Sequence, residues 1–572
     1  MLFSRFTQTA WALATALLLT ALPTQAKADK PNILFIMSDD HTTQAIGAYG
    51  GMLAQFDPTP TLDQIAAEGM RFTAALCSNS ICTPSRATIM TGQYGHINGV
   101  PTLNDPLLIE RQYLAQEMNA AGYETAVIGK WHLKNRPEAF DHYQVLPVQG
   151  LYFNPEFFIR GQEEPITIEG HSTDVITDLA LEWLDGEERD ADKPFFLKLQ
   201  YKAPHDYFEN APRYNDYLAD VVIPEPTSMF DDPCHGSVAT RGVDGELHGV
   251  IGTSIGRRHY RRSYAKDFIA PKLPHDAKEG QPEIGPTDLE AKRAAYQIYL
   301  KRYLRCVKGV DDNIARVVAY LKDNDLYDNT VIIYTGDQGM WLGEHDYQDK
   351  RWAYEESLRM PLLIRYPKSI PAGTVSDALI ENVDFAPTML DFAGVETPEY
   401  MQGKSFRPIL EIGEKPEGWR DAAFYQYWMH MIHHQVPAHM AMRTERFKLI
   451  FFHGRPLVDR HMPWWAEVAK HPTPPGWELY DLSVDPGENN NVYEDPAYAE
   501  DVKQLKERFA KLIAEVKADD PSAAGSDFAR QQMEALMPYL EKYWDDTPEN
   551  KAEAARISGE LHEFIYGKKD AE

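Results

Sequence analysis

The segment ICTPSRATIMTG, Ile81 to Gly92, places Cys82 where a helix is expected to begin. Pro84 suits the first turn of a helix, and the residues after it are mostly compatible with helix formation. The free N–H groups and the dipole at such an N-terminus favour negative charge. On these observations alone, Cys82 fits either a thiolate nucleophile with a lowered pKa or an inert buried cysteine.

Acidic and amide side chains follow two apolar segments that predict buried strands. In PNILFIMSDDH, a run of five apolar residues precedes Asp39 and Asp40, and TVIIYTGDQG ends in the same way at Asp337 and Gln338. Three carboxylates and an amide oxygen are hard ligands that suit Ca²⁺ or Mg²⁺ better than zinc. Solvated or capping side chains are the alternative.

Two further apolar segments, YETAVIGKWH and PFFLKLQYKAPH, also end in polar residues. Helical patterns such as TLDQIAAEGM and YLKRYLRCVKGVDDNIARVVAYLKDN lie between the strands. This alternation predicts an α/β fold with a large, mostly parallel sheet that helices cover on both faces. Ligands of such sheets bind beyond the carboxyl ends of the strands, where the polar residues lie.

The pattern changes after about residue 400. HMAMRTERFKLIFFHG alternates like an antiparallel strand, and GWELYDLSVDPGENNN predicts a short strand followed by a turn. EDVKQLKERFAKLIAEVKA has apolar residues at helical spacing. We therefore expect an α/β domain over residues 29–400 and a smaller C-terminal α+β domain with an antiparallel sheet over residues 401–572.

The N-terminal residues 1–28 predict a cleaved export signal. Arg5 is followed by the apolar stretch WALATALLL and by the small residues of TQAKA. An uncleaved membrane anchor is the alternative, and no later segment contains the eighteen or more apolar residues that a transmembrane helix needs. We expect an exported protein, periplasmic or secreted, without stable membrane insertion.

Charge and cysteine content narrow the class of partner. The formal net charge of −29 argues against a nucleic-acid partner and requires a local basic pocket for any polyanionic substrate. The four cysteines show neither CxxC nor zinc spacing. If Cys82 is used in chemistry, at least one of Cys77, Cys234 and Cys306 is unpaired.

The segment CTPSR followed by Met-Thr-Gly resembles the sulfatase signature C-x-P-S-R-x-x-x-L/M-T-G. DDH, GKWHL, APH, DQGMWLGEH and DKRWAYEES accompany it in the family's order. The chain is thus identified as a member of the formylglycine-dependent type I sulfatases, within the alkaline phosphatase superfamily. The resemblance implies an alkaline phosphatase-like fold and a sulfuric ester hydrolase. It also implies that a separate maturation enzyme oxidises Cys82 to formylglycine (3-oxoalanine).

In that family one hydroxyl of the hydrated aldehyde attacks sulfur, and the second allows sulfate to be expelled. The implied ligands of one Ca²⁺, with Mg²⁺ as the alternative, are Asp39, Asp40, Cys82 after conversion, Asp337 and Gln338. The implied catalytic residues are Cys82, Arg86 for the ionised hydrate, Lys130 and Lys350 for the sulfate, His132 as base and His205 as acid. Asn or His often takes the place of Gln338 in the family, so the longer arm of Gln338 leaves its geometry open. Lys130 and His132 alternate as on an extended segment, which would direct both side chains to one side.

Two segments are candidates for contact with the alcohol part of the substrate. GRRHYRRSY contains Arg257 and Arg258, and YWMHMIHHQVPAHM contains His433 and His434 between His430 and His439. A solvated basic loop explains the arginines equally well, and the histidines also suit a second metal. Histidines at these spacings would share a helix face if the segment is helical.

The predicted function is hydrolysis of O-sulfate, or N-sulfate, groups on a carbohydrate, as in bacterial polysaccharide sulfatases. The expected partners are a sulfated carbohydrate and the formylglycine-generating maturation enzyme. One alternative is a phosphonate monoester or phosphodiester hydrolase of the same superfamily. Another is a non-catalytic protein that binds sulfated glycans, in which Cys82 stays a thiol.

Overall fold

The structure is a computed structural model that describes residues 30–566 except 187–188, 231–233, 244, 246, 248–254, 256–287, 433 and 457–463. The predicted export signal, residues 1–28, therefore lies outside the described residues. Residues from Pro31 onward form one unit, and the boundary at residue 400 stays a prediction. Among the described helices, none combines the length and the apolar character that a membrane crossing requires.

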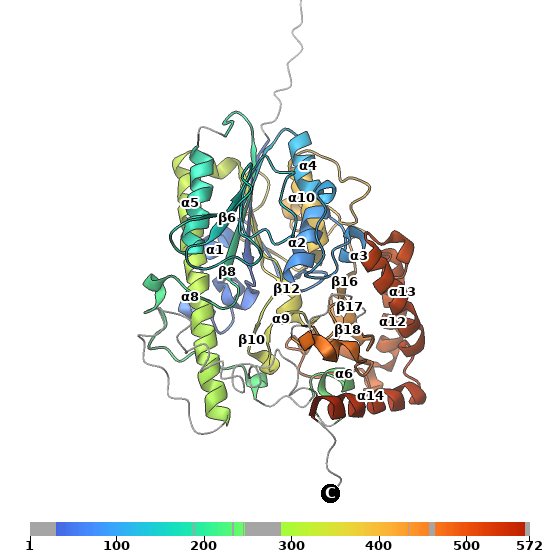
Figure 1. Ribbon diagram of the computed structural model, residues 1–572. Helices are drawn as coiled ribbons and strands as arrows, with labels where there is room; N and C mark the ends of the chain where they lie inside the picture. The colour runs from blue at the N-terminus through green and yellow to red at the C-terminus, as the bar shows by residue number, and fades with distance from the viewer. Residues whose placement is uncertain are drawn as a thin grey trace, which may run out of the picture. The chain divides into compact units, whose positions relative to one another are not determined.

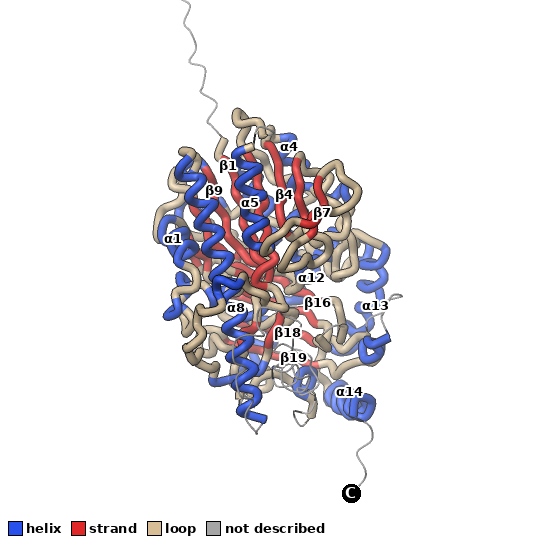
Figure 2. The backbone as a smooth tube through the Cα atoms, turned by 60° about the vertical axis from the view of Figure 1, so that its left-hand side comes forward, coloured by secondary structure: helices blue, strands red, loops and turns tan. Residues whose placement is uncertain are grey.

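The apolar segments that the sequence predicted as strands form the centre of a ten-stranded sheet (Figures 1 and 2). Five neighbouring strands at this centre, β9, β1, β8, β4 and β5, are parallel. Most of the pairs outside them are antiparallel. The strands in spatial order are β14 (Thr374–Ser376), β2 (Met70–Phe72), β13 (Leu362–Arg365), β9 (Thr330–Gly336), β1 (Asn32–Asp39), β8 (Phe195–Pro204), β4 (Glu124–Gly129), β5 (His142–Val145), β6 (Glu156–Ile159) and β7 (Ile166–Thr167).

Helices cover both faces of this sheet, as predicted, and β1 shows why its sequence is continuously apolar. Ile33, Phe35 and Met37 pack into one buried cluster, whereas Leu34 and Ile36 pack into another on the opposite face. Figure 1 shows the two layers on either side of the sheet. One layer contains α2 (Cys82–Thr91), α4 (Tyr113–Ala120) and α10 (Phe385–Phe392), and the other contains α1 (Pro60–Glu68), α5 (Ser172–Asp185) and α8 (Asp288–Asp323).

A second, antiparallel sheet follows in the C-terminal part of the chain, also as predicted. One of its faces packs against α12 and α13, and the other joins the core of the large sheet. Its elements are β16 (Ala422–Tyr427), β17 (His439–Thr444), β18 (Phe447–Phe452), β19 (Gly476–Asp481), α12 (Ala499–Glu515), α13 (Asp527–Tyr543) and α14 (Pro548–Tyr566).

The segment HMAMRTERFKLIFFHG forms two strands and not the single strand expected. The hydroxyl of Thr444 accepts a hydrogen bond from the backbone N–H of Phe447 and donates one to its carbonyl. This pair of bonds closes a tight turn without Gly, Pro or Asn, which is why the sequence pattern did not reveal it.

Short elements complete the connections between these layers. β12, β3 and β15 form a three-stranded sheet, and β10 pairs with β11. The bounds are β3 (Ala75–Leu76), β10 (Trp341–Leu342), β11 (Gln348–Asp349), β12 (Arg359–Met360), β15 (Ile380–Glu381), α3 (Gly95–Asn98), α6 (Val238–Arg241), α9 (Glu355–Leu358) and α11 (Arg407–Ile412).

A buried ion-pair cluster connects the C-terminal sheet to α2. Arg420, just before β16, places Nη2 2.6 Å from Oδ1 of Asp384 and contacts Glu381 through Nη1. Between these two acids, Asn382 donates a hydrogen bond of 2.9 Å to Oγ of Ser85 on α2. The turn that carries both carboxylates therefore also supports the helix that begins at Cys82.

Replacing Arg420 by methionine should strongly destabilise the fold. The change leaves Glu381 and Asp384 buried without their cation, a loss that costs about 3–5 kcal/mol in comparable sites. Urea unfolding of the purified variant measures the loss in free energy of unfolding.

Arg508→Met is the matched control. Arg508 pairs with Asp421 at 2.7 Å, but Asp421 is 70% exposed, so we expect a loss below about 1 kcal/mol. Similar small losses in both variants would contradict the role given to Arg420.

Candidate active site

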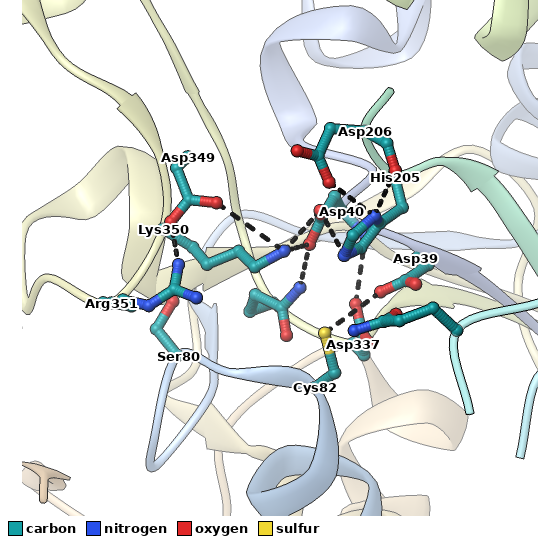
Figure 3. A network of polar contacts seen from close by, with 12 residues as sticks. Asp39, Asp40, Ser80, Cys82, His205, Asp206, Asp337, Asp349, Lys350 and Arg351 are labelled. Carbon is teal, nitrogen blue, oxygen red and sulfur yellow. Dashed lines mark hydrogen bonds and ion pairs between the residues drawn. The ribbon is translucent and has the colours of Figure 1, made fainter. Parts of the chain in front are cut away.

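The predicted metal ligands and catalytic residues meet at one edge of the large sheet, and Figure 3 shows part of this cluster. Neighbouring parallel strands end at the same edge, so residues far apart in sequence become neighbours there. Asp39 and Asp40 follow from β1, Asp337 and Gln338 from β9, Lys130 and His132 from β4, and His205 from β8.

Three carboxylates lie together at this edge. Oxygen atoms of Asp39, Asp40 and Asp337 all lie within 4.8 Å of one another, and all three side chains are buried. The backbone N–H of Asp40 donates to Oδ1 of Asp337 at 3.1 Å. Burial raises the pKa of Asp40 to about 6, against the opposing charge of Lys350. Three buried acids at such distances need compensating positive charge.

Buried cations supply that charge. The pairs are Lys350 with Asp40 (Nζ to Oδ1, 2.6 Å), Arg86 with Asp337 (Nε to Oδ2, 3.0 Å) and Lys130 with Asp39. Burial disfavours the charged form of Asp337, but Arg86 and Lys130 outweigh it and lower the pKa of this carboxyl. The predicted sulfate-binding lysines thus lie beside the predicted metal ligands.

The donor set fits a hard divalent cation. Gln338 is fully buried and donates through Nε2 to Asp40, whereas its Oε1 accepts no hydrogen bond from the part of the chain that is described. A buried carbonyl oxygen without a donor is costly unless it binds a cation. Together with the three carboxylates, Gln338 therefore fits Ca²⁺ or Mg²⁺, despite its departure from the family's usual residue.

Cys82 is the first residue of α2, as predicted, and it lies within the same cluster. Its Sγ is 3.4 Å from Oδ1 of Asp39, and the residue is 1% exposed. Burial raises the pKa of the Cys82 thiol to about 12, although Lys350 acts in the opposite direction. The interpretation as a thiolate with a lowered pKa is therefore not supported, because the thiol stays protonated at neutral pH.

His205 joins the acid cluster from β8. Its Nε2 lies 3.8 Å from Oδ2 of Asp40, and its Nδ1 lies 2.9 Å from Oδ1 of Asp206. Burial lowers the pKa of His205 well below its usual value, and Lys350 adds to the effect. Asp206 thus holds the ring with Nε2 directed to the cluster (Figure 3).

His132 lies beyond β4, which ends at Gly129. The backbone of His132 has φ 55, so the segment is not extended through this residue as predicted. The side chain is 5% exposed, and Nδ1 is buried without a hydrogen bond to any described residue. Burial and the charge of Lys130 lower the pKa of His132 well below its usual value. A neutral imidazole in this position can accept a proton.

Several polar neighbours of the site were not singled out from the sequence. Oε1 of Gln149 accepts a hydrogen bond of 2.5 Å from Nζ of Lys130. Asp349 and Arg351 flank Lys350 and pair with each other. Nδ1 of His434, a predicted substrate-binding residue, lies 3.7 Å from Oδ2 of Asp349. The segment DKRWAYEES contains Asp349 and Arg351 beside the recognised lysine, whereas nothing in the sequence around Gln149 indicates its contact.

The structure tests only part of the remaining predictions on substrate-binding residues and cysteines. Arg257, Arg258 and His433 lie outside the described residues. His430 is buried in a non-helical segment, where its Nδ1 accepts a hydrogen bond of 3.2 Å from the backbone of Ala438. The side chains of His430 and His434 therefore do not share a helix face. All four cysteines are free thiols in the structure.

Comparison with known proteins first establishes the class of fold. One solved structure contains a protein in complex with its substrate, D-glucosamine-2-N,6-O-disulfate. It is similar to this chain with a TM-score of 0.74 and 37% sequence identity, and the match covers 86% of this chain and 99% of the other. A phosphonate monoester hydrolase of Silicibacter pomeroyi has a TM-score of 0.63 at 24% identity, and the match covers 85% of this chain and 95% of the other. This likeness shows the fold alone. The fold is that of alkaline phosphatase-like enzymes.

Sequence comparison then identifies the family. The profile of the family named Sulfatase matches residues 31–395, and that of the C-terminal region of N-sulphoglucosamine sulphohydrolase matches residues 343–461. An N-acetylglucosamine-6-O-sulfatase of Bacteroides thetaiotaomicron is 39% identical over 530 residues, 89% of this chain and 90% of the relative. An arylsulfatase of Clostridium perfringens is 25% identical over 528 residues, which cover 85% of this chain and 94% of the relative. The chain belongs to the sulfatase family and is an enzyme that hydrolyses sulfate esters.

Calcium should stabilise the protein through the acid cluster. A ligand that binds only the folded state at 100 times its Kd contributes about 2.7 kcal/mol. We therefore expect Ca²⁺ to raise the Tm of EDTA-treated protein, and expect Gln338→Leu to reduce the rise because it removes one oxygen of the predicted donor set. Differential scanning calorimetry measures both effects.

Gln149→Leu is the control, because Gln149 contacts Lys130 but lies outside the proposed donor set. Its rise in Tm should equal that of the unmodified chain. A Tm that responds to neither Ca²⁺ nor Mg²⁺ would contradict the metal site.

Proposed function

We propose that this sulfatase removes a 6-O-sulfate group from a glucosamine residue of a sulfated polysaccharide, such as a glycosaminoglycan, or of its oligosaccharides. The observation that carries the proposal is 39% identity over 530 residues to a protein named N-acetylglucosamine-6-O-sulfatase. The similarity to a structure that contains D-glucosamine-2-N,6-O-disulfate supports the same class of substrate. We further propose that the protein is exported to the periplasm or secreted.

We propose that Cys82 is converted to formylglycine, whose hydrated aldehyde supplies an oxygen nucleophile for the sulfate ester. The protonated, buried thiol supports a precursor role for Cys82, because such a thiol is a poor nucleophile. Every residue of α2 is buried. A maturation enzyme could not reach Cys82 in the folded protein, so conversion has to precede folding.

Ca²⁺, held by Asp39, Asp40, Asp337, Gln338 and residue 82, would lower the cost of negative charge on the reacting oxygens. Lys130 and Lys350 would bind the sulfate from their present positions beside Asp39 and Asp40. Arg86 reaches Asp337 and the backbone carbonyl of Lys130, and this fixes its guanidinium beside residue 82.

The two histidines would move protons in the proposed reaction. Nε2 of His205 is directed to the acid cluster, where the protonated ring, favoured by the charge of Asp206, would donate its Nε2 proton to the departing sugar oxygen. Asp206 binds Nδ1 and thereby holds the ring in this orientation. His132 has a buried Nδ1 without a partner in the described chain, so it would act as the base that allows sulfate to leave.

The departing sugar would lie toward His205, and the polar residues around Lys350 would add a further contact to it. His434 and Asp349 contact each other there, and Arg351 pairs with the same aspartate. Arg257, Arg258 and His433 remain candidate contacts to the sugar.

Sulfate release from N-acetylglucosamine 6-sulfate tests the proposed function. The protein is produced in a host that makes formylglycine, and a loss of about 18 Da in the peptide containing residue 82 confirms conversion. We expect release by the converted protein and none by Cys82→Ala. Ion chromatography quantifies the sulfate.

Three outcomes would contradict the proposal. Release of other sulfates but not of 6-O-sulfate would reject the assigned position. A large preference in kcat/KM for a phosphodiester with the same leaving group would favour the phosphodiesterase alternative. Binding of sulfated glycans by converted protein without any release would favour the glycan-binding alternative.

His205→Ala should slow hydrolysis of sugar sulfates far more than that of activated aryl sulfates. A sugar alkoxide needs a proton as it leaves, and loss of a general acid costs about 10²–10⁴-fold, whereas a stable phenolate needs little assistance. Steady-state kcat/KM for 6-sulfated sugar and for 4-nitrophenyl sulfate measures the two effects. Equal losses on both substrates would show that His205 does not act as the acid.

A further inference from the structure

One buried lysine near the site has no carboxylate partner within the described part of the chain. Lys202, close to the end of β8, is 5% exposed. Its Nζ lies 4.7 Å from the centre of the ring of Tyr152, and no hydrogen bond or ion pair joins it to the residues that the structure describes. In contrast, Lys130 and Lys350 each contact an aspartate of the acid cluster. The ammonium of Lys202 therefore retains unused hydrogen-bond donors.

Contacts and charges place Lys202 on the His205 side of the site. The hydroxyl of Tyr152, whose ring lies under the ammonium, donates a hydrogen bond to the backbone carbonyl of His205. Among the charges that raise the pKa of Lys202, those of Asp206 and Glu209 have a larger effect than that of Asp40. His205 is the proposed acid for the departing sugar oxygen, so this is the side on which the sugar lies.

Lys202 is also close enough to Lys130 to affect it. Burial is the main cause that lowers the pKa of Lys130, and the charge of Lys202 is the second. Lys130 has Asp39 as its partner, whereas the contact of Lys202 among the described residues is the ring face of Tyr152. An anionic group beside Lys202 would satisfy its donors and reduce the repulsion between the two ammonium groups.

The lysine at the middle of the same strand differs in this respect. Lys198 is also buried, but its Nζ is 3.0 Å from Sδ of Met90 and lies above the ring of Phe35. Lys198 and Lys202 are four positions apart along the strand, which corresponds to about 13 Å. Lys198 is therefore part of the core, whereas Lys202 borders the site.

We propose that Lys202 binds a second anionic group of the substrate, in addition to the sulfate that is hydrolysed. The group is a sulfate or a carboxylate, carried by the sulfated sugar or by its neighbour in the chain. The inference rests on the proposed function, because it takes a sulfated carbohydrate as the ligand. It makes Lys202 a residue that selects more highly charged substrates.

Ligand binding tests the proposal without requiring turnover. The full mature chain with Cys82 left as a thiol is titrated in calcium buffer by isothermal calorimetry. The ligands are N-acetylglucosamine 6-sulfate with one anionic group, glucosamine-2-N,6-O-disulfate with a second sulfate, and a disaccharide of a uronic acid and 6-sulfated N-acetylglucosamine with a carboxylate. Lys202→Met removes the charge, Lys202→Arg keeps it, and Lys198→Met is the control for loss of a buried lysine from β8.

We expect the unmodified chain to bind at least one of the doubly anionic ligands more tightly than the singly sulfated sugar. A hydrogen bond to a charged group corresponds to roughly a 10- to 100-fold change in affinity. Lys202→Met should lose that factor for the same ligand and change the Kd for the singly sulfated sugar less than about 3-fold. Lys202→Arg should retain most of the preference, and Lys198→Met should retain all of it. Whichever ligand shows the effect identifies the anion as sulfate or carboxylate.

Equal losses for all ligands in Lys202→Met would overturn the proposal and leave Lys202 as a support for Tyr152. Equal affinity of the unmodified chain for all three ligands, or binding of none, would also overturn it. If Lys202→Met does not fold, retention of the preference in a folded Lys202→Gln variant would overturn it, and its loss would support it. Failure of the proposed function appears separately, as absence of sulfate release from converted protein that nevertheless binds these ligands.

Discussion

The close approach of three buried carboxylates is the constraint on which the rest of this site depends. Asp39, Asp40 and Asp337 come from two strands whose parallel ends bring them together. Such a group is unstable without positive charge, and Lys130, Lys350 and Arg86 provide it from three other segments. The same charges suit the binding of a metal ion and a sulfate. The aspartates can bind the metal ion in place of the protein's cations, and the cations can bind the sulfate in place of the aspartates.

The surrounding fold holds these charges in place by burying the elements that carry them. The helix α2 is buried along its whole length, and the turn at Asn382 supports it through Ser85. Arg420 fixes that turn against the C-terminal sheet. The C-terminal sheet shares its core with the large sheet, so it contributes to the stability of the site although the acid cluster lies elsewhere.

The two sides of the site have different character. Around Cys82 the cations are already paired with carboxylates, which suits the binding of one small, highly charged group. Toward His205 and Tyr152 the charged groups are less fully paired. There Lys202 lies over the aromatic ring of Tyr152, and Asp206 binds the ring of His205. Chemistry on sulfur and recognition of the sugar would thus be divided between the two sides, and the family relationship explains the first better than the second.

The sequence by itself determined that strands and helices alternate along the chain, because continuous apolar runs and helical periodicity reflect burial on both faces of a sheet. It also determined the acidic ends of two strands, the helix that begins at Cys82 and the signature of the sulfatase family, each of which is a local pattern. The fold brought the two acidic strand ends together. Only the tertiary structure decided that His132 has a left-handed backbone conformation, that the thiol of Cys82 stays protonated and that Gln149 reaches Lys130. It also decided that Lys202 is buried without a carboxylate partner among the described residues, whereas Lys198 belongs to the core. The reason is physical: pKa values and hydrogen-bond partners depend on neighbours that are distant in sequence, and no local pattern encodes those neighbours.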